Sequence, residues 1–253
     1  YFYKVLILQH IMKSLVLAGG EATRLRPLSY VTPKSLLDVK GKPVFAHILD
    51  NLDGSANLNE ILIFYSHEYE SQFTAFEKYY RYQKELKFIS DRQKNHQDDP
   101  GLIGSIAHVV RSEKIEDDLL VTAGDNLYDF RIDDFINFHR SNKRKTCIAV
   151  HEFKHKSEVA GKYGVVELKE NGLKIANFEE KPHNPKTSLA ATLCYILSIK
   201  DLHHLDKKIF KENAGELIKH LVDNGQDVFA FGFRGKWFDI GTYDDLMKAR
   251  REF

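Results

Sequence analysis

The chain has 253 residues and a formal net charge of +1, from 37 lysines and arginines against 36 aspartates and glutamates. Hydrophobic residues make up 43% of it, which is enough for a large core and excludes a disordered tail. The charge balance argues against a nucleic-acid partner, because proteins that bind nucleic acids are usually markedly basic. Anionic small molecules stay open as ligands, since a few lysines and arginines bind a phosphate without changing the total.

The N-terminal segment and the cysteines indicate a protein of the cytoplasm. The early apolar run, residues 5–12, is too short to span a bilayer, and no small-residue cleavage site follows it, so we expect no membrane association. Cys147 and Cys194 occur singly in apolar segments, which predicts buried, reduced thiols. Met12 is a candidate start, which leaves residues 1–11 as an N-terminal extension whose origin the sequence does not fix.

Strands and helices alternate through the first half of the chain. A short apolar run at residues 13–18, ending at a glycine pair, is typical of a buried strand. Strands separated by helices indicate parallel crossovers, so we predict an α/β fold: three layers around a mostly parallel mixed sheet, as in Rossmann-like proteins. After that first strand we expect helices near residues 43–52, 73–80, 103–110 and 132–142, and strands at residues 60–66, 86–90 and 118–123.

The second half has a different pattern. Asn171 and Gly172 form a strong hairpin signal between strands predicted at residues 165–168 and 174–178. We therefore expect antiparallel strands to be added to the parallel sheet. Further strands are predicted at residues 189–197, 228–231 and 236–240, and a helix at residues 216–222.

Residues 17–34, LAGGEATRLRPLSYVTPK, are the most informative segment. Gly19 and Gly20 let a ligand approach the backbone, whose N–H groups bind anionic oxygen. Arg24 offers a planar fork for a phosphate and Lys34 a point charge. A polar turn with solvated basic residues is the alternative, and the Walker A spacing is absent.

This segment resembles the signature of the sugar nucleotidylyltransferases, L-A-G-G-x-G-T-R-L-x-P followed by a P-K pair. Ala22 stands where the family has a glycine, and a positive φ there would cost alanine about 1 kcal/mol. The resemblance implies one domain over residues 12–253, with a nucleotide-binding half at 12–130 and a sugar-binding half at 131–253. It implies that the nucleotide contacts Leu17, Ala18, Gly19, Gly20, Arg24, Lys34 and Gly101, with Arg24 and Lys34 acting in catalysis.

Two further segments resemble family motifs that bind Mg²⁺. Gly124-Asp125-Asn126 is similar to G-D-N, and residues 237–242, WFDIGT, are similar to W-x-D-x-G-T. The resemblance implies that Asp125, which is also catalytic, and Asp239 bind Mg²⁺, and that Asn126 lies near the sugar. A turn and a helix cap at Thr242 are the structural alternatives.

The predicted hairpin carries the sugar motifs. Tyr163-Gly164 and Glu179-Glu180-Lys181-Pro182 resemble Y-G and E-E-K-P, and a two-residue turn would pair Tyr163 with Glu180 and Gly164 with Glu179. The resemblance implies that Glu180 holds the sugar and that Lys181, as a catalytic residue, holds its phosphate. It also implies sugar-pocket positions for Gly164, Ala191 and Tyr195.

Two other polar clusters have simpler interpretations. His151-Glu152-Phe153-Lys154-His155 fits the zinc pattern H-E-x-x-H, but it continues a predicted strand, where the two histidines would lie about 13 Å apart and could not share a zinc ion. The basic residues 143–145 are expected to be exposed loop residues.

The resemblance implies Mg²⁺-dependent nucleotidyl transfer from a nucleoside triphosphate, dTTP or UTP first, to a sugar 1-phosphate, glucose 1-phosphate first. The products would be a nucleoside-diphosphate sugar and pyrophosphate. Family members read the base through the loop that here spans residues 91–101, where Gly101 can be aligned but Gln93 and Gln97 cannot. A glycosyltransferase and a non-catalytic binding subunit are the alternatives. Homo-oligomers are common in the family, and nothing in the sequence sets their number.

Overall fold

A computed structural model of the chain describes residues 11–20, 22–91, 101–170, 172–206 and 214–253. In its first half, four parallel strands lie in the order β6-β1-β4-β5. They are β1 (Met12–Leu17), β4 (Leu58–Tyr65), β5 (Glu85–Ser90) and β6 (Leu119–Ala123), and the helices between them are α1 (Val44–Asp53), α2 (Glu70–Tyr79) and α3 (Gly101–Ser112). A short hairpin of β2 (Asp38–Val39) and β3 (Lys42–Pro43) precedes α1. The predicted parallel crossovers are confirmed.

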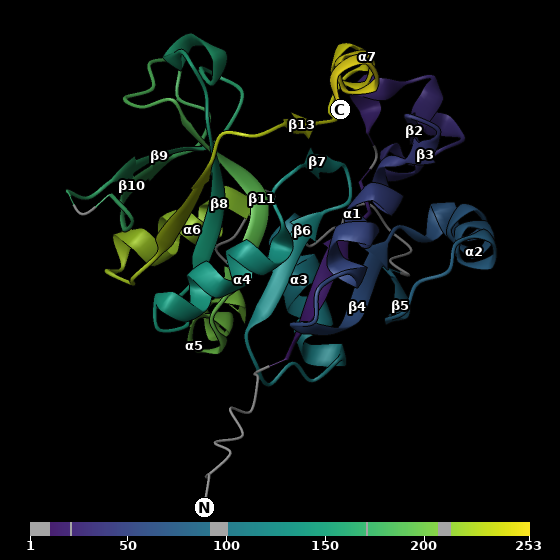
Figure 1. The fold of residues 1–253 in the computed structure, drawn as a ribbon, viewed down its shortest axis with the longest axis horizontal. Helices are drawn as coiled ribbons and strands as arrows, with labels where there is room; N and C mark the ends of the chain where they lie inside the picture. Colours follow the sequence, from purple (N-terminus) through teal and green to yellow (C-terminus); the bar gives the residue numbers. More distant parts are fainter. Residues whose placement is uncertain (1–10, 21, 92–100, 171, 207–213) are drawn as a thin grey trace, which may run out of the picture.

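The second half extends the same sheet with antiparallel strands, as predicted. β11 (Leu189–Leu197) pairs antiparallel with β6 and so joins the two halves (Figure 1). β8 (Cys147–Glu152), β9 (Val165–Leu168), β10 (Ile175–Glu179) and β12 (Phe229–Phe233) complete the nine described strands of this sheet. β7 (Asn126–Tyr128) and β13 (Trp237–Asp239) form a separate antiparallel pair. The helices of this half are α4 (Ile132–Ser141), α5 (Ile199–Leu202), α6 (Ala214–Asp223) and α7 (Tyr243–Glu252).

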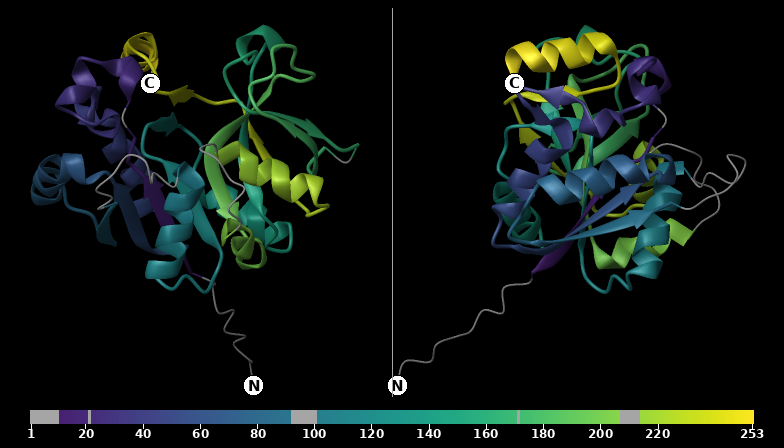
Figure 2. Two further views of the ribbon diagram at one scale, coloured as in Figure 1. Left: turned by 180° about the vertical axis from the view of Figure 1, so that it is seen from behind. Right: turned by 90° about the vertical axis from the view of Figure 1, so that its right-hand side faces the viewer.

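Helices cover both faces of the sheet, which gives the predicted three layers. Figures 1 and 2 show α1 and α4 on one face and α3 and α6 on the other. Side chains alternate along the strands, so each strand supplies both cores. In β1, Val16 belongs to the core under α1, whereas Leu15 and Leu17 belong to the core under α3. The predicted α/β fold is confirmed.

The predicted hairpin register is wrong by one residue. Near the turn, Lys169 pairs with Lys174 as predicted, since the Lys169 N–H donates to the Lys174 carbonyl. An irregularity between Ile175 and Asn177 then shifts the pairing, and Glu179 lies opposite Val165. This extra residue moves the following backbone by one position, so the Lys181 N–H donates to the carbonyl of Tyr163. Asn171 of the predicted turn lies outside the described residues.

A buried ionic network lies at the start of β6, around Asp118. This is the end of the strand away from Gly124. The Asp118 carboxylate, 1% exposed, accepts hydrogen bonds from His139 Nε2, Arg144 Nε and the Ile199 N–H. Burial works to raise the pKa of Asp118, but these hydrogen bonds outweigh it and lower the pKa. The prediction that residues 143–145 are exposed is confirmed for Lys143 and wrong for Arg144 and Lys145, which are half-buried. Arg144 also pairs with Asp117, and Lys145 pairs with Asp227.

Other expectations can be checked directly. His151 lies on β8 and His155 lies beyond its end, so the H-E-x-x-H segment is not helical, as predicted. Cys147 and Cys194 are buried free thiols, also as predicted. Among the described residues, no helix combines the length and the apolar character that crossing a bilayer requires. Of the predicted N-terminal extension, residues 1–10 lie outside the described residues.

Candidate active site

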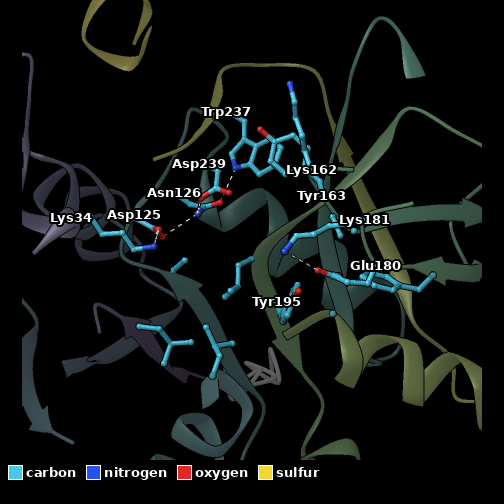
Figure 3. A pocket seen from close by; sticks show the side chains of 18 of the residues that line it. Lys34, Asp125, Asn126, Lys162, Tyr163, Glu180, Lys181, Tyr195, Trp237 and Asp239 are labelled. Atoms are coloured by element: carbon cyan, nitrogen blue, oxygen red, sulfur yellow. Dashed lines mark hydrogen bonds and ion pairs between the residues drawn. The ribbon is translucent and has the colours of Figure 1, made fainter. Parts of the chain in front are cut away.

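A pocket of about 250 Å³ lies where the two halves of the chain meet, beyond the carboxyl ends of β1 and β6. Both halves contribute to its lining (Figure 3). Such a position is where ligands bind in open α/β sheets. Of the site residues predicted from the sequence, those that line it are Leu17, Gly19, Lys34, Asp125, Asn126, Gly164, Glu180, Lys181, Ala191, Tyr195 and Asp239.

Two carboxylates face each other on one side of the pocket. Asp125 follows β6 and Asp239 ends β13, and the β7–β13 pairing brings them together by placing Asp239 opposite Asn126. The amide Nδ2 of Asn126 lies 3.1 Å from Asp125 Oδ1 and 3.1 Å from Asp239 Oδ1, so one side chain bridges the two acids. The Lys34 ammonium forms an ion pair with the other oxygen of Asp125.

The electrostatics of this cluster follow from burial and from the closeness of the charges. Burial, together with the neighbouring Asp125 carboxylate, raises the pKa of Asp239 to about 6. Burial alone would lower the pKa of Lys34, but attraction to Asp125, the hydrogen bond to it and attraction to Asp239 leave that pKa raised. Asp125 and Asp239 therefore concentrate negative charge on this side of the pocket, and the Lys34 ammonium lies against it.

The opposite side of the pocket carries Glu180 and Lys181, which follow β10. Figure 3 shows their side chains across the pocket from Lys34 and Asp125. The two residues form an ion pair, with Lys181 Nζ 3.5 Å from Glu180 Oε1. Two glycines leave room for the Glu180 carboxylate: a Cβ at Gly164 would lie 3.2 Å from Glu180 Oε2, and one at Gly215 would lie 2.5 Å from it. Glu180 therefore lies in a slot that a side chain at position 215 would close and one at position 164 would narrow.

Several lining residues were missing from the sequence-based set. Tyr163 of the Y-G motif and Trp237 of the W-x-D-x-G-T motif form an aromatic wall, with ring centroids 4.8 Å apart. Burial raises the pKa of Tyr163 to about 12, so its phenol stays neutral. The others are Leu102, Ala123, Lys162, Phe178, Leu193 and Gly215. Leu193 could have been predicted from the sequence, because Ala191, Leu193 and Tyr195 alternate along β11 and share a face.

Four predicted site residues do not line the pocket. Ala18 is buried, and Gly20, at φ +132°, lies beside the aliphatic chain of Lys34. Arg24 is exposed on the loop after Ala22. Gly101 opens α3 with a φ of +63°, and its neighbour Leu102 lines the pocket instead. Of the loop expected to read the base, residues 92–100 lie outside the described residues.

Ala22 has the backbone conformation that its position predicted. Its φ of 46° and ψ of 42° are left-handed, the region that favours glycine. Its carbonyl accepts hydrogen bonds from the Leu25 N–H and from Ser29 Oγ, which hold this conformation in place.

The carboxylate pair has the chemistry that Mg²⁺ prefers. In the described part of the chain, no group of three or more His, Cys, Asp or Glu side chains is arranged to hold a metal ion. Mg²⁺, however, is usually bound by one or two carboxylates, with water and substrate phosphates completing its shell. Asp125 and Asp239 fit that mode, because they are close enough for one amide group to contact both.

Known proteins resemble this chain along nearly its whole length. A glucose-1-phosphate thymidylyltransferase of Streptomyces antibioticus is 30% identical over 245 residues, which cover 95% of this chain and 65% of the relative. A UTP–glucose-1-phosphate uridylyltransferase of Haloferax volcanii is 27% identical, with 95% and 96% covered. A crystal structure of UDP-glucose pyrophosphorylase with UDP-glucose superimposes with a TM-score of 0.76 at 20% identity, covering 95% of this chain and 97% of that one.

The chain thus spans about two thirds of the first of these relatives and nearly all of the second. The structural likeness, at 20% identity, supports the fold that β1, β4, β5 and β6 already showed. The sequence profile of the nucleotidyl transferase family matches residues 13–253. The chain belongs to the nucleotidyl transferase family.

Proposed function

We propose that this chain transfers a nucleotidyl group from a nucleoside triphosphate to a sugar 1-phosphate, with Mg²⁺ as its cofactor. The observation that carries the proposal is the pocket itself, with a lysine and a carboxylate pair on one side and a lysine and a carboxylate on the other. Two phosphorylated substrates need two cationic positions, and a sugar needs hydroxyl acceptors. The named relatives favour glucose 1-phosphate with dTTP or UTP as the first substrates to test.

In this reaction an oxygen of the sugar phosphate attacks the α-phosphorus of the triphosphate. The new P–O bond forms as the bond from the α-phosphorus to the bridging oxygen breaks, and pyrophosphate leaves with that electron pair. Such chemistry depends on in-line positioning and charge stabilisation rather than on a nucleophilic side chain.

The residues divide between the two substrates. Glu180 accepts hydrogen bonds from sugar hydroxyls, and Lys181 binds the phosphate of the attacking substrate, exchanging its ion pair with Glu180 for the stronger contact with a dianion. Lys34 neutralises charge on the triphosphate. Arg24, on the exposed loop, supplies a second cation to the leaving pyrophosphate.

Asp125 and Asp239 would hold Mg²⁺. The ion, when bound, stabilises negative charge on the phosphate oxygens. Asn126 bridges the two acids, and its backbone position opposite Asp239 keeps them together. The buried, reduced cysteines suit a reducing compartment, so we place the reaction in the cytoplasm.

The test is pyrophosphate release from a panel of four nucleoside triphosphates, each with several sugar 1-phosphates. The proposal predicts release that requires both substrates and is lost in Asp125→Ala and Lys181→Ala. Release of a nucleoside diphosphate from a nucleotide sugar would identify a glycosyltransferase instead. Nucleotide binding without turnover across the panel would identify a binding subunit.

A further inference from the structure

Trp237 makes a polar contact that its place in the aromatic wall does not require. Its indole Nε1 lies 2.9 Å from Oδ1 of Asn126, whose side chain is buried and belongs to the adjacent strand β7. The β7–β13 pairing produces this contact, because Trp237 lies two residues before Asp239, the residue opposite Asn126. Figure 3 shows the indole, the amide and the carboxylates in one chain of contacts.

The chemistry of the indole determines which way the Asn126 amide points. An indole N–H only donates, so its partner is the amide oxygen, and the amide nitrogen is turned toward the acids. That nitrogen then donates to Asp125 and Asp239, at 3.1 Å each. The flipped amide would set its N–H₂ against the indole N–H and its oxygen against two carboxylates, three unfavourable contacts in a buried place.

The indole is itself held in place. Its ring contacts Tyr163, at 4.8 Å between centroids, and His151, at 5.7 Å, and Phe153 lies 6.0 Å away. The donor therefore keeps a fixed position relative to Asn126. A phenylalanine at position 237 would keep an aromatic ring in this wall, but it would lose the N–H together with part of the indole ring.

We propose that Trp237 is a positioning residue for the metal-binding carboxylates and acts through Asn126. Its N–H orients the amide, and the oriented amide holds Asp125 and Asp239 at a spacing that suits one divalent cation. The inference rests on the proposed function, because it assigns these two acids to the metal. Groups that orient metal ligands in this way are typically worth about 10- to 100-fold in metal affinity.

The experiment measures metal binding without substrates. Isothermal titration with Mg²⁺ alone should show binding about 10- to 100-fold weaker in Trp237→Phe than in the wild type. Asn126→Leu should show a similar loss, and the double variant should lose no more than Asn126→Leu alone, because the indole acts only through the amide. Phe138→Leu removes an aromatic ring that packs against Phe231 and does not line the pocket, and its Mg²⁺ affinity should be that of the wild type.

A second readout needs no variant at position 237. Trp237 is the only tryptophan in the chain, so its indole N–H gives a single resonance in a ¹H–¹⁵N spectrum. That resonance should shift during a Mg²⁺ titration, and its hydrogen exchange should be faster in Asn126→Leu than in the wild type.

Three results would overturn the inference: no Mg²⁺ binding by the wild type, wild-type affinity in Trp237→Phe, or additive losses in the double variant. The proposed function is tested separately. If Trp237→Phe and Asn126→Leu weaken Mg²⁺ binding as expected but the wild type releases no pyrophosphate, this inference stands and the proposed reaction is wrong.

Discussion

Gly215 provides a test of the sugar side of the pocket that no sequence motif suggested. It lies in the first turn of α6, and a Cβ added there would lie 2.5 Å from Glu180 Oε2 and 2.7 Å from Phe178 Cζ. Both contacts are roughly 1 Å shorter than optimal packing between heavy atoms. Phe178 is 1% exposed and packed in the core, whereas the Glu180 carboxylate is the end of a flexible side chain, so we expect Gly215→Ala to displace Glu180 and to strain the packing of Phe178.

The expected effects on stability and on substrate binding differ in size. Overpacking costs about 1–3 kcal/mol, and alanine in place of glycine in a helix recovers about 1 kcal/mol, so the free energy of unfolding falls by about 0–2 kcal/mol. Displacing Glu180 removes a hydrogen bond to a charged acceptor, worth about 1.5–3 kcal/mol. The KM for sugar 1-phosphate should therefore rise about 10- to 150-fold, while the KM for the nucleoside triphosphate should stay close to that of the wild type.

The assay is steady-state pyrophosphate release with each substrate varied in turn, alongside urea unfolding. Gly232→Ala is the matched control, because a Cβ at Gly232 meets no atom within 4 Å. A variant of Gly215 that loses stability but keeps the wild-type KM for sugar 1-phosphate would refute the role of Glu180. Equal increases in both KM values would show a general distortion of the pocket rather than a local one.

Three further predictions concern stability. Ala22→Gly should raise the free energy of unfolding by up to about 1 kcal/mol in urea titrations, because it removes a left-handed alanine; a decrease would contradict the strain at that position. Lys34→Met should lower the free energy of unfolding by about 3 kcal/mol in EDTA, because it removes the cation that pairs with the buried Asp125 carboxylate. Adding Asp125→Asn to Lys34→Met should recover most of that loss. Asp118→Asn should cost about 3–5 kcal/mol at pH 7. Because the pKa of Asp118 is lowered in the folded state, its contribution to stability is present above about pH 4 and is lost as the pH falls through the folded pKa. Urea unfolding at a series of pH values should therefore show the free energies of unfolding of the variant and the wild type converging only below about pH 4.

The fold was predictable because local patterns and packing agree. The apolar run at residues 189–197 forms β11 with the same bounds, since its flanking residues are polar and its length suits one strand. The helix expected near residues 43–52 is α1, whose apolar residues Val44, Ile48, Leu49 and Leu52 recur at helical spacing and are all buried. The hairpin register was not predictable from the turn, because the irregularity between Ile175 and Asn177 depends on how the strand fits the rest of the sheet.

The candidate site was predictable where its residues fall in short motifs, as Asp125 and Asn126 do. Gly215 carries no such signal, because its role comes from contact with Phe178 and Glu180, about 35 residues earlier in the chain. The contact of Trp237 Nε1 with Asn126 was not predictable either, because it depends on the pairing of β7 with β13 and on the side-chain conformations of both residues.

The most direct measurement of the central claim follows the two ends of a labelled nucleotide. The protein is incubated with a sugar 1-phosphate and UTP or dTTP carrying ³²P at either the α- or the γ-position, and the products are separated. The account predicts that the α-label appears in the nucleoside-diphosphate sugar and the γ-label in pyrophosphate, in equal amounts. Label from the γ-position in inorganic phosphate or in the sugar, or from the α-position in free nucleotide alone, would contradict it.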